Sequence, residues 1–128
     1  MGDGATGKTI LFADDEPSVR KVLGRRLGLW GYQVVTASDG AEALRIAEAR
    51  PPDLVLLDVM MPGLDGMEVC RRLKAMPQTA KIPVILVTAK DLDISDEQLH
   101  EIGAFAFLAK PYSAAVLLRT IQRALGEA

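Results

Sequence analysis

Short apolar runs alternate along the chain with longer segments in which apolar residues recur every three or four positions. The runs at 54–57 and 84–87 are continuous rather than alternating with polar residues, which is typical of strands buried on both faces of a parallel sheet. Together with three similar runs they predict five strands, at residues 9–13, 33–37, 53–58, 83–88 and 105–109.

The segments between these strands carry the spacing and the start signals of helices. The first is predicted to begin near Pro17, to end at Gly31 and to bury one face. That face comprises Val19, Val22, Leu23, Leu27 and Trp30. Three further helices are expected to begin with capping boxes, in which the cap residue is followed three positions later by Glu or Gln. The pairs are Asp39 with Glu42, Asp65 with Glu68, and Ser95 with Gln98, and a fifth helix follows Ser113.

Five strands that alternate with five helices predict an α/β fold with a parallel central sheet. We expect a five-stranded sheet in the order 2-1-3-4-5, flanked by five helices, as in flavodoxin-like doubly wound domains. The 128 residues suffice for a single domain. Residues 1–7 contain no large apolar side chain apart from Met1, so we expect a disordered tail over 1–7 and a folded domain over 8–128.

The composition excludes several classes of protein. Hydrophobic residues make up 49% and charged residues 25% of the chain, and the net charge of −2 lacks the basic excess with which proteins bind nucleic acid directly. No apolar run approaches the roughly 18–20 residues of a membrane helix, so we expect no membrane insertion. The single Cys70 cannot form an internal disulfide, which favours a reduced, cytoplasmic location. With His100 as the only histidine, a metal cage of His and Cys ligands is also excluded.

Candidate chemistry gathers where the predicted strands end. Asp14 and Asp15 follow the first strand, Asp58 ends the third, Thr88 ends the fourth and Lys110 follows the fifth. In an open parallel sheet of this order these ends lie side by side, at the edge where such sheets bind ligands. Crowded carboxylates need a cation, and hard oxygen ligands select Mg²⁺ or a similar divalent ion over zinc. Asp58 would then be free to act as a nucleophile on phosphorus, with Thr88 and Lys110 binding phosphoryl oxygens.

Each of these residues has a simpler explanation when it is taken alone. Single aspartates at strand ends are usually helix caps or solvated loop residues, which is our interpretation of Asp39, Asp53 and Asp65. Asp14 and Asp15 would likewise suit the positive N-terminal end of the first helix. The required groups stand at four separate strand ends, however, and coincidence is a poor explanation for all four together.

The whole pattern resembles the chemotaxis-regulator-like receiver domain of two-component response regulators. The matching motifs, in the expected order, are Asp14-Asp15, the block Asp-Val-Met-Met-Pro-Gly-Leu-Asp-Gly at 58–66, Thr88-Ala89 and Lys110-Pro111. The resemblance covers about residues 8–126, essentially the whole predicted domain. Asp-Asp or Lys-Pro alone would carry no weight, but the set is highly specific.

The resemblance implies a phosphorylation-dependent switch in which Asp58 accepts a phosphoryl group from a histidine kinase or a histidine phosphotransfer protein. Thr88 and Lys110 would bind the phosphoryl oxygens, and the Lys110–Pro111 peptide bond would be cis. The implied ligands of Mg²⁺ or Mn²⁺ are Asp14, Asp15, Asp58 and the backbone carbonyl of Met60. A regulator of this kind catalyses only its own phosphorylation and dephosphorylation and is otherwise not an enzyme.

The resemblance also implies how the signal leaves the domain. Thr88 would move inward after phosphorylation and Phe107 would turn into the space behind it, which changes the surface of the fourth helix, fifth strand and fifth helix. An unknown downstream protein would bind this face, and the domain would be a monomer or a weak phosphorylation-dependent dimer. The family often has Tyr in place of Phe107, so a readout through a hydroxyl is absent. Met60 and Lys90 stand where the family tunes the phosphoryl lifetime, and since Met60 cannot hydrogen-bond a hydrolytic water, we expect slow self-dephosphorylation.

Other functions stay open on the sequence alone. A phosphate-independent, receiver-like docking module would share the fold. In a flavodoxin-like FMN protein, Asp14 and Asp15 would repel the phosphate of the flavin, and in an aspartyl-phosphate phosphatase a general acid would replace Met60. The pattern G-x-x-x-x-G-K-T at residues 2–9 precedes strand-like residues instead of a helix, so we interpret it as accidental.

Overall fold

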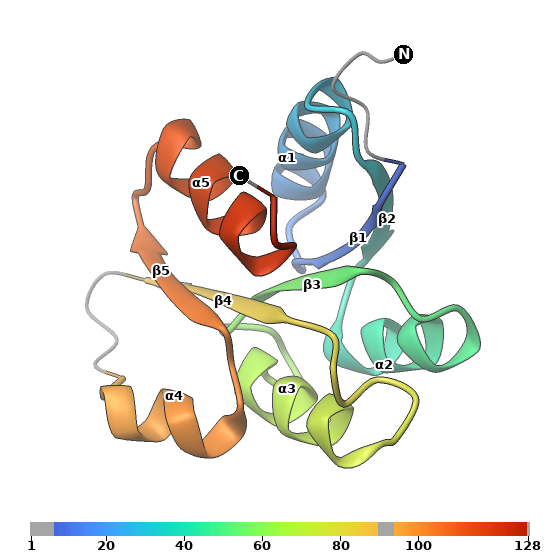
Figure 1. Cartoon of the computed structure of the whole chain (residues 1–128), viewed down its shortest axis with the longest axis vertical. Coiled ribbons are helices and arrows are strands. Elements are labelled where there is room, and N and C mark those ends of the chain that lie inside the picture. The colour runs from blue at the N-terminus through green and yellow to red at the C-terminus, as the bar shows by residue number, and fades with distance from the viewer. Residues whose placement is uncertain (1–6, 90–93, 128) are drawn as a thin grey trace.

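The computed structural model describes residues 7–89 and 94–127. The strands are β1 (Thr9–Ala13), β2 (Gln33–Ala37), β3 (Leu54–Asp58), β4 (Val84–Ala89) and β5 (Ala106–Lys110). The helices are α1 (Pro17–Leu29), α2 (Gly40–Ala49), α3 (Gly66–Ala75), α4 (Asp96–Ile102) and α5 (Ala114–Ala124). All strand pairs are parallel and their order is β2-β1-β3-β4-β5, which confirms the predicted fold and topology (Figure 1).

The predicted boundaries of β3, β4 and β5 each differ from the observed ones by one residue. β3 begins at Leu54 rather than at Asp53, and the Asp53 carboxylate accepts a hydrogen bond from the Thr9 N–H at 2.8 Å at the start of β1. At the other end of the sheet, β5 extends to Lys110, which pairs with Ala89 of β4. Lys110 is therefore part of the sheet, and strand pairing fixes the position of its backbone.

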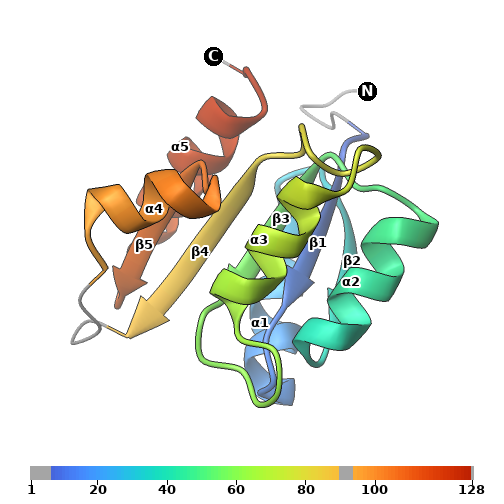
Figure 2. The same ribbon diagram turned by 90° about the horizontal axis from the view of Figure 1, so that it is seen from below.

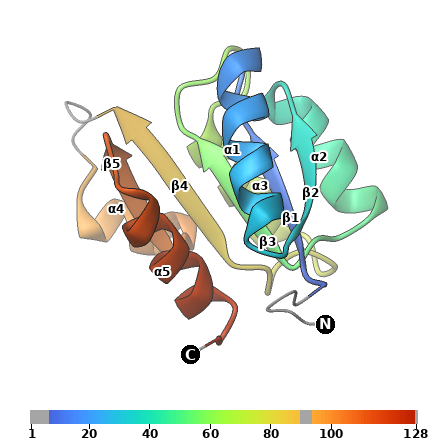
Figure 3. The same ribbon diagram turned by 90° about the horizontal axis from the view of Figure 1, so that it is seen from above.

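Helices cover both faces of the sheet. α1 and α5 pack on one face, which is turned toward the viewer in Figure 3, and α2, α3 and α4 pack on the other (Figure 2). Side chains of β1 alternate between the two layers: Ile10 and Phe12 belong to the core under α1 and α5, whereas Leu11 and Ala13 belong to the opposite core. Since β3 is buried along its whole length, polar groups of the central strands reach solvent only at their ends.

The helix start signals are partly confirmed. Asp39, Asp65 and Ser95 each accept a hydrogen bond from the backbone N–H three residues later, but only the box formed by Ser95 and Gln98 is complete. The other two glutamates have different partners. The Glu42 carboxylate accepts from the Ser38 N–H at 2.6 Å, and the Glu68 carboxylate pairs with Arg71 and Arg72.

One predicted core residue of α1 lies outside the core. Val22 is 65% exposed, whereas Leu23 and Leu27 are buried and Val19 is partly buried. Residues 19, 23 and 27 are spaced by four, so they form a narrow stripe along the helix, and Val22 lies about a quarter turn away from it. α1 therefore touches the sheet along one row of side chains and leaves a neighbouring apolar row open.

Two further predictions concern the ends and the surface of the chain. Residues 1–6 lie outside the described part of the structure, so the predicted tail over 1–7 stays a prediction, and Gly7 is exposed. Among the described residues no helix is long and apolar enough to cross a membrane. Cys70 is buried and unpaired, and its thiol donates a hydrogen bond to the Ile102 carbonyl at 3.4 Å, as fits a small core residue.

Candidate functional site

The predicted site residues meet at the carboxyl-terminal edge of the sheet. Asp14 follows β1, Asp58 is the last residue of β3, and Lys110 is the last residue of β5. Oxygens of Asp14, Asp15 and Asp58 all lie within 4.8 Å of one another. The Lys110 Nζ atom is 3.3 Å from Asp58 Oδ2 and 3.9 Å from Asp14 Oδ2. Parallel register produces this convergence, because it brings the ends of adjacent strands to one edge.

Burial makes the acidic cluster electrostatically costly. Asp14 is 1% exposed, and this burial, together with the nearby Asp58 carboxylate, raises its pKa to about 6. Hydrogen bonding from the Glu16 N–H to Asp14 Oδ1, at 2.9 Å, acts in the opposite direction but is outweighed. Burial also acts to lower the pKa of Lys110, yet the carboxylates of Asp58 and Asp14 prevail and raise it. Among the described residues, the Lys110 ammonium contacts two of the three clustered carboxylates, so the cluster has capacity for a further cation.

Thr88 carries a hydroxyl whose hydrogen-bonding capacity is unused. Its side chain is fully buried, and Oγ1 has no hydrogen-bond partner among the described residues. Buried hydroxyls without a partner are rare, since each costs free energy that pairing would recover. Thr88 lies near the end of β4, and β4 is the neighbour of β3, which ends at Asp58. The Thr88 hydroxyl is therefore at the same edge of the sheet as the carboxylates. It is suited to an incoming oxygen.

The backbone around Asp58 fixes its carboxylate. The Met60 N–H donates to Asp58 Oδ1 at 3.0 Å, and the Gly66 N–H donates to the Val59 carbonyl at 3.0 Å. A Cβ atom on Gly66 would lie 2.5 Å from the Asp58 carbonyl oxygen, closer than any side chain can approach. Residue 66 must therefore be glycine for α3 to begin directly behind the acceptor strand.

Arg20 supports the site in a way that the sequence did not predict. Its guanidinium donates to the backbone carbonyl of Asp14 at 2.7 Å and so ties the end of β1 to the second turn of α1. This contact was missed because an arginine six residues downstream of its carbonyl partner has no recognisable motif. The N-cap of α1 is Glu16, with Pro17 in the first turn as predicted. Neither Asp14 nor Asp15 is the N-cap, although Asp14 Oδ1 accepts a hydrogen bond from the N–H of the N-cap residue Glu16.

The aspartates set aside in the sequence do lie away from this cluster. Asp39 and Asp65 are the N-caps of α2 and α3, and Asp53 holds the start of β1. Of the remaining predicted residues, Phe107 is half-buried in β5 and pairs with Leu86, and the Met60 side chain is 61% exposed. Lys90 lies outside the described residues. The predicted cis bond between Lys110 and Pro111 is present.

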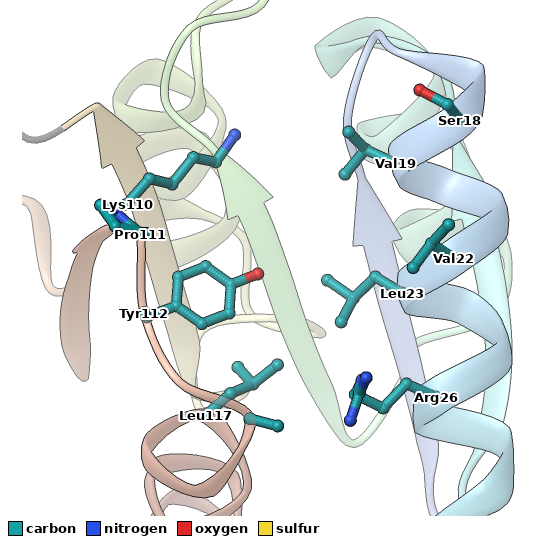
Figure 4. Close-up of a pocket in the computed structure, with 10 residues that line it drawn as sticks. Ser18, Val19, Val22, Leu23, Arg26, Lys110, Pro111, Tyr112 and Leu117 are labelled. Atoms are coloured by element: carbon teal, nitrogen blue, oxygen red, sulfur yellow. The ribbon is translucent and has the colours of Figure 1, made fainter.

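A groove of about 570 Å³ opens beside Lys110, between α1 and the segment that leads from β5 into α5 (Figure 4). The exposed side chain of Val22 and the buried Leu117 line its apolar walls. Lys110 and Arg26 stand at its two ends, and the Tyr112 ring lies between them with its hydroxyl directed toward α1 (Figure 4). Burial raises the pKa of Tyr112, so the phenol stays neutral in this groove. Lys110, which lines this groove, also contacts Asp58 and Asp14 of the acidic cluster.

A divalent cation fits the donor set of this edge. Three carboxylates supply hard oxygen ligands within mutual reach, and the chemistry of such sites favours Mg²⁺ or Mn²⁺ over softer metals. The raised pKa of Asp14 shows the electrostatic cost that a cation would relieve. The residues present therefore suit the ion that the sequence predicted.

Comparisons with known proteins agree with this geometry. Residues 10–122 match the family model described as the response regulator receiver domain. The chain is 46% identical over 106 residues to the alkaline phosphatase synthesis transcriptional regulatory protein PhoP of Bacillus subtilis, covering 83% of this chain and 43% of that protein. It thus spans less than half the length of this curated relative.

Solved structures show the same similarity. The chemotaxis response regulator CheY4 of Vibrio cholerae matches with a TM-score of 0.85 at 32% identity, over 94% of this chain and 100% of that chain. The receiver domain of a sensor histidine kinase from Pseudomonas aeruginosa matches with a TM-score of 0.85 at 34% identity, over 95% of this chain and 100% of that chain. The latter structure has a magnesium ion coordinated in its active site cleft.

Proposed function

The chain belongs to the response regulator receiver domain family, which acts in two-component signalling by phosphorylation on aspartate, and on that premise we propose that Asp58 is its phosphoacceptor. The phosphoryl group comes from a histidine kinase or a histidine phosphotransfer protein. The observation that carries the proposal is the placement of Asp58 between two other carboxylates and the Lys110 ammonium, 3.3 Å away. Few structural roles would justify such a cluster at the buried end of a central strand.

In the transfer step, a carboxylate oxygen of Asp58 attacks phosphorus and the bond from phosphorus to the histidine nitrogen breaks. The Lys110 ammonium, already beside Asp58, moves its interaction to a phosphoryl oxygen as the negative charge passes there. The unpartnered Thr88 hydroxyl donates to another phosphoryl oxygen. Asp14, Asp15, Asp58 and the Met60 carbonyl would hold Mg²⁺ or Mn²⁺, whose charge offsets the carboxylates and the incoming phosphoryl oxygens.

The domain is a signalling switch, and its own chemistry is limited to the gain and loss of this phosphoryl group. Loss requires water to attack phosphorus. The Met60 thioether is a poor hydrogen-bond acceptor and does not orient that water, so the self-dephosphorylation is slow. Lys90, the second residue expected to tune the lifetime, lies outside the described residues and stays a prediction.

The phosphodonor docks over the groove between α1 and the start of α5. Lys110 lies at one end of this groove, so a partner seated in it has its phosphohistidine near Asp58 (Figure 4). Val22 is 65% exposed on α1 and supplies apolar contact area that the fold leaves open. Partner choice then depends on α1, whose exposed residues have no general code.

The output surface comprises α4, β5 and α5, which lie together on the side of the sheet where β5 is the edge strand (Figures 1 and 2). Thr88 moves toward the phosphoryl group, and Phe107, half-buried in β5, turns into the space that Thr88 leaves. A downstream protein, or a second copy in a weak dimer, binds the altered face. The longer relatives are named transcriptional regulators, so nucleic acid is reached through a partner or a further domain and not by this domain directly.

Intact mass after incubation with acetyl phosphate tests the proposal. Wild-type protein should gain one phosphoryl group in Mg²⁺ and none when the divalent ions are chelated, and Asp58→Asn should gain none in either condition. Asp65→Asn is the matched control, because Asp65 is an exposed helix cap and its loss leaves the acceptor in place. Absence of an adduct on folded wild-type protein would overturn the proposal and favour a phosphate-independent docking module.

A further inference from the structure

Met60 combines an exposed thioether with a position next to the acceptor carboxylate. Its side chain is 61% exposed, and its backbone N–H donates to Asp58 Oδ1 at 3.0 Å. The residue is therefore next to the acidic cluster in the backbone and largely exposed to solutes. Thioethers of this kind are oxidised to sulfoxides in proteins, and the oxidation is reversed by methionine sulfoxide reductases.

The other described methionines are better protected than Met60. Met61 is 6% exposed, and Met67 and Met76 are partly buried against the core under α2, α3 and α4. Oxidation follows solvent exposure, so among the described methionines Met60 reacts first. Met67 is a near neighbour for comparison, since it lines the same surface hollow of about 540 Å³ in the loop that follows β3.

We propose that Met60 is a redox modification site at which a hydroperoxide shortens the lifetime of the phosphoryl group on Asp58. The thioether sulfur attacks the terminal oxygen of the hydroperoxide, the O–O bond breaks, and an S–O bond forms. Sulfur loses two electrons, and the hydroperoxide leaves as the corresponding alcohol, or as water when hydrogen peroxide is the oxidant. The inference rests on the proposed function, because it concerns the stability of the phosphorylated state.

The chemical change acts on the step that the thioether fails to assist. A thioether accepts hydrogen bonds weakly, whereas a sulfoxide has a strongly polar S–O group that can hold a water molecule. Residue 60 is two positions from the acceptor and its backbone N–H holds Asp58 Oδ1, so we place the S–O group within reach of the attacking water. Oxidation of Met60 therefore converts a residue that leaves this water unoriented into one that positions it, and the phosphoryl group is lost faster.

The test measures the half-life of the phosphoryl adduct before and after mild treatment with hydrogen peroxide. Peptide mass analysis assigns the added oxygen, and intact mass follows the adduct that acetyl phosphate and Mg²⁺ produce. Oxidation at Met60 should shorten the half-life about threefold to tenfold, the range that one additional hydrogen bond provides. Methionine sulfoxide reductase should restore the original half-life.

Two variants separate Met60 from general oxidative damage. Met60→Leu should show the same half-life with and without peroxide treatment, whereas Met67→Leu should keep the response. Preferential oxidation of Met67, or an oxidised Met60 with an unchanged half-life, would overturn the inference. These outcomes differ from a failure of the proposed function, in which untreated wild-type protein forms no adduct.

Discussion

Several polar groups at the amino-terminal edge of the sheet, where the strands begin, are paired across elements, although Glu127 Oε2 has no partner among the described residues. At the carboxyl-terminal edge, by contrast, the carboxylates crowd together. At the first edge Tyr32, 6% exposed, donates to Glu127 Oε1 at 2.7 Å, and Lys8 donates to the Leu125 carbonyl at 3.1 Å. Asp53 accepts from the Thr9 N–H at 2.8 Å. These contacts fasten the end of α5 and the start of β3 to β1 and β2.

At the carboxyl-terminal edge, buried polar groups are crowded or without a partner in the described structure. Asp14 and Asp58 are both buried, share the single ammonium of Lys110, and stand beside a Thr88 hydroxyl that has no partner in the described structure. The pKa of Asp14 rises to about 6 as a result. One sheet thus carries an edge that stabilises the fold and an edge that gives up stability for binding capacity. Removal of a polar side-chain group should therefore lower stability at the first edge and raise it at the second.

Gly66→Ala should have the largest effect, because it disturbs the backbone that carries the site. The added Cβ atom would meet the Asp58 carbonyl oxygen at 2.5 Å and the Val59 Cα atom at 3.0 Å, and neither can rotate away. We expect the free energy of unfolding in urea to fall by about 3 kcal/mol, as in strongly overpacked cores, and the acetyl phosphate adduct to be largely lost.

Gly28→Ala is the matched control for Gly66→Ala. A Cβ atom on Gly28, an exposed residue of α1, meets nothing within 4 Å. This variant should gain up to about 1 kcal/mol from helix propensity and should be phosphorylated normally. Equal stability of the two variants would show that the close approach at Gly66 does not constrain the edge.

Asp14→Asn should stabilise the protein in the absence of divalent ions. Its folded-state pKa of about 6 lies above the ordinary value of 3.8 for an aspartate, so between these values the folded state holds a proton that the unfolded state releases. This stabilising contribution is complete below pH 3.8 and is lost as the pH rises through about 6. At pH 7 the variant should exceed wild type by about 2 kcal/mol in urea denaturation, and this advantage should shrink toward pH 4.

Added Mg²⁺ should reverse this order. Wild type should gain stability from the ion, whereas Asp14→Asn should gain much less. The control Asp15→Asn changes an exposed carboxylate, so its metal-free stability should differ from wild type by less than about 0.5 kcal/mol. A metal-free Asp14→Asn variant no more stable than wild type at pH 7 would contradict the view that this edge is costly.

The sequence predicted the carboxyl-terminal edge better than the amino-terminal one, for a physical reason. Continuous apolar residues, such as those at 84–87, predict the strands. Once the strands are parallel and in this order, their ends bring four polar residues to one edge: Asp14, Asp58, Thr88 and Lys110. The contact between Tyr32 and Glu127 joins residues 95 positions apart and has no local pattern. Its existence depends on where α5 ends in space.

The hydrogen-bond partners of side chains at the helix starts could not be predicted from the sequence either. The spacing of Glu42 and Glu68 from their caps suits a capping box, but Ser38 and the arginines of α3 compete for these carboxylates. Val22 is exposed because the sheet covers only the row of α1 that carries Val19, Leu23 and Leu27. Helical periodicity identifies an apolar face but does not say how much of that face a neighbour covers.

Two buried threonines offer the next comparison, since both are fully buried but only one hydroxyl is paired. Thr79 Oγ1 donates to the Leu73 carbonyl at 2.6 Å, and Thr88 Oγ1 has no partner in the described structure. Thr79→Val should therefore destabilise the protein by about 1 kcal/mol, and Thr88→Val should stabilise it by a similar amount. Only Thr88→Val should slow phosphorylation. Loss of stability in both variants would mean that the Thr88 hydroxyl is paired in solution.

Tyr32→Phe should have the smallest effect and should leave the site untouched. The variant keeps the buried ring and removes only the hydrogen bond to Glu127, so the free energy of unfolding should fall by about 0.5–1 kcal/mol. Burial and the Glu127 carboxylate raise the pKa of Tyr32, which keeps the phenol protonated as a donor up to strongly alkaline pH. Phosphorylation by acetyl phosphate and the response to Mg²⁺ should match wild type, since the sheet separates the two edges. A change in either readout would show that the edges are coupled through α5, and the division between a stabilising edge and a binding edge would then be wrong.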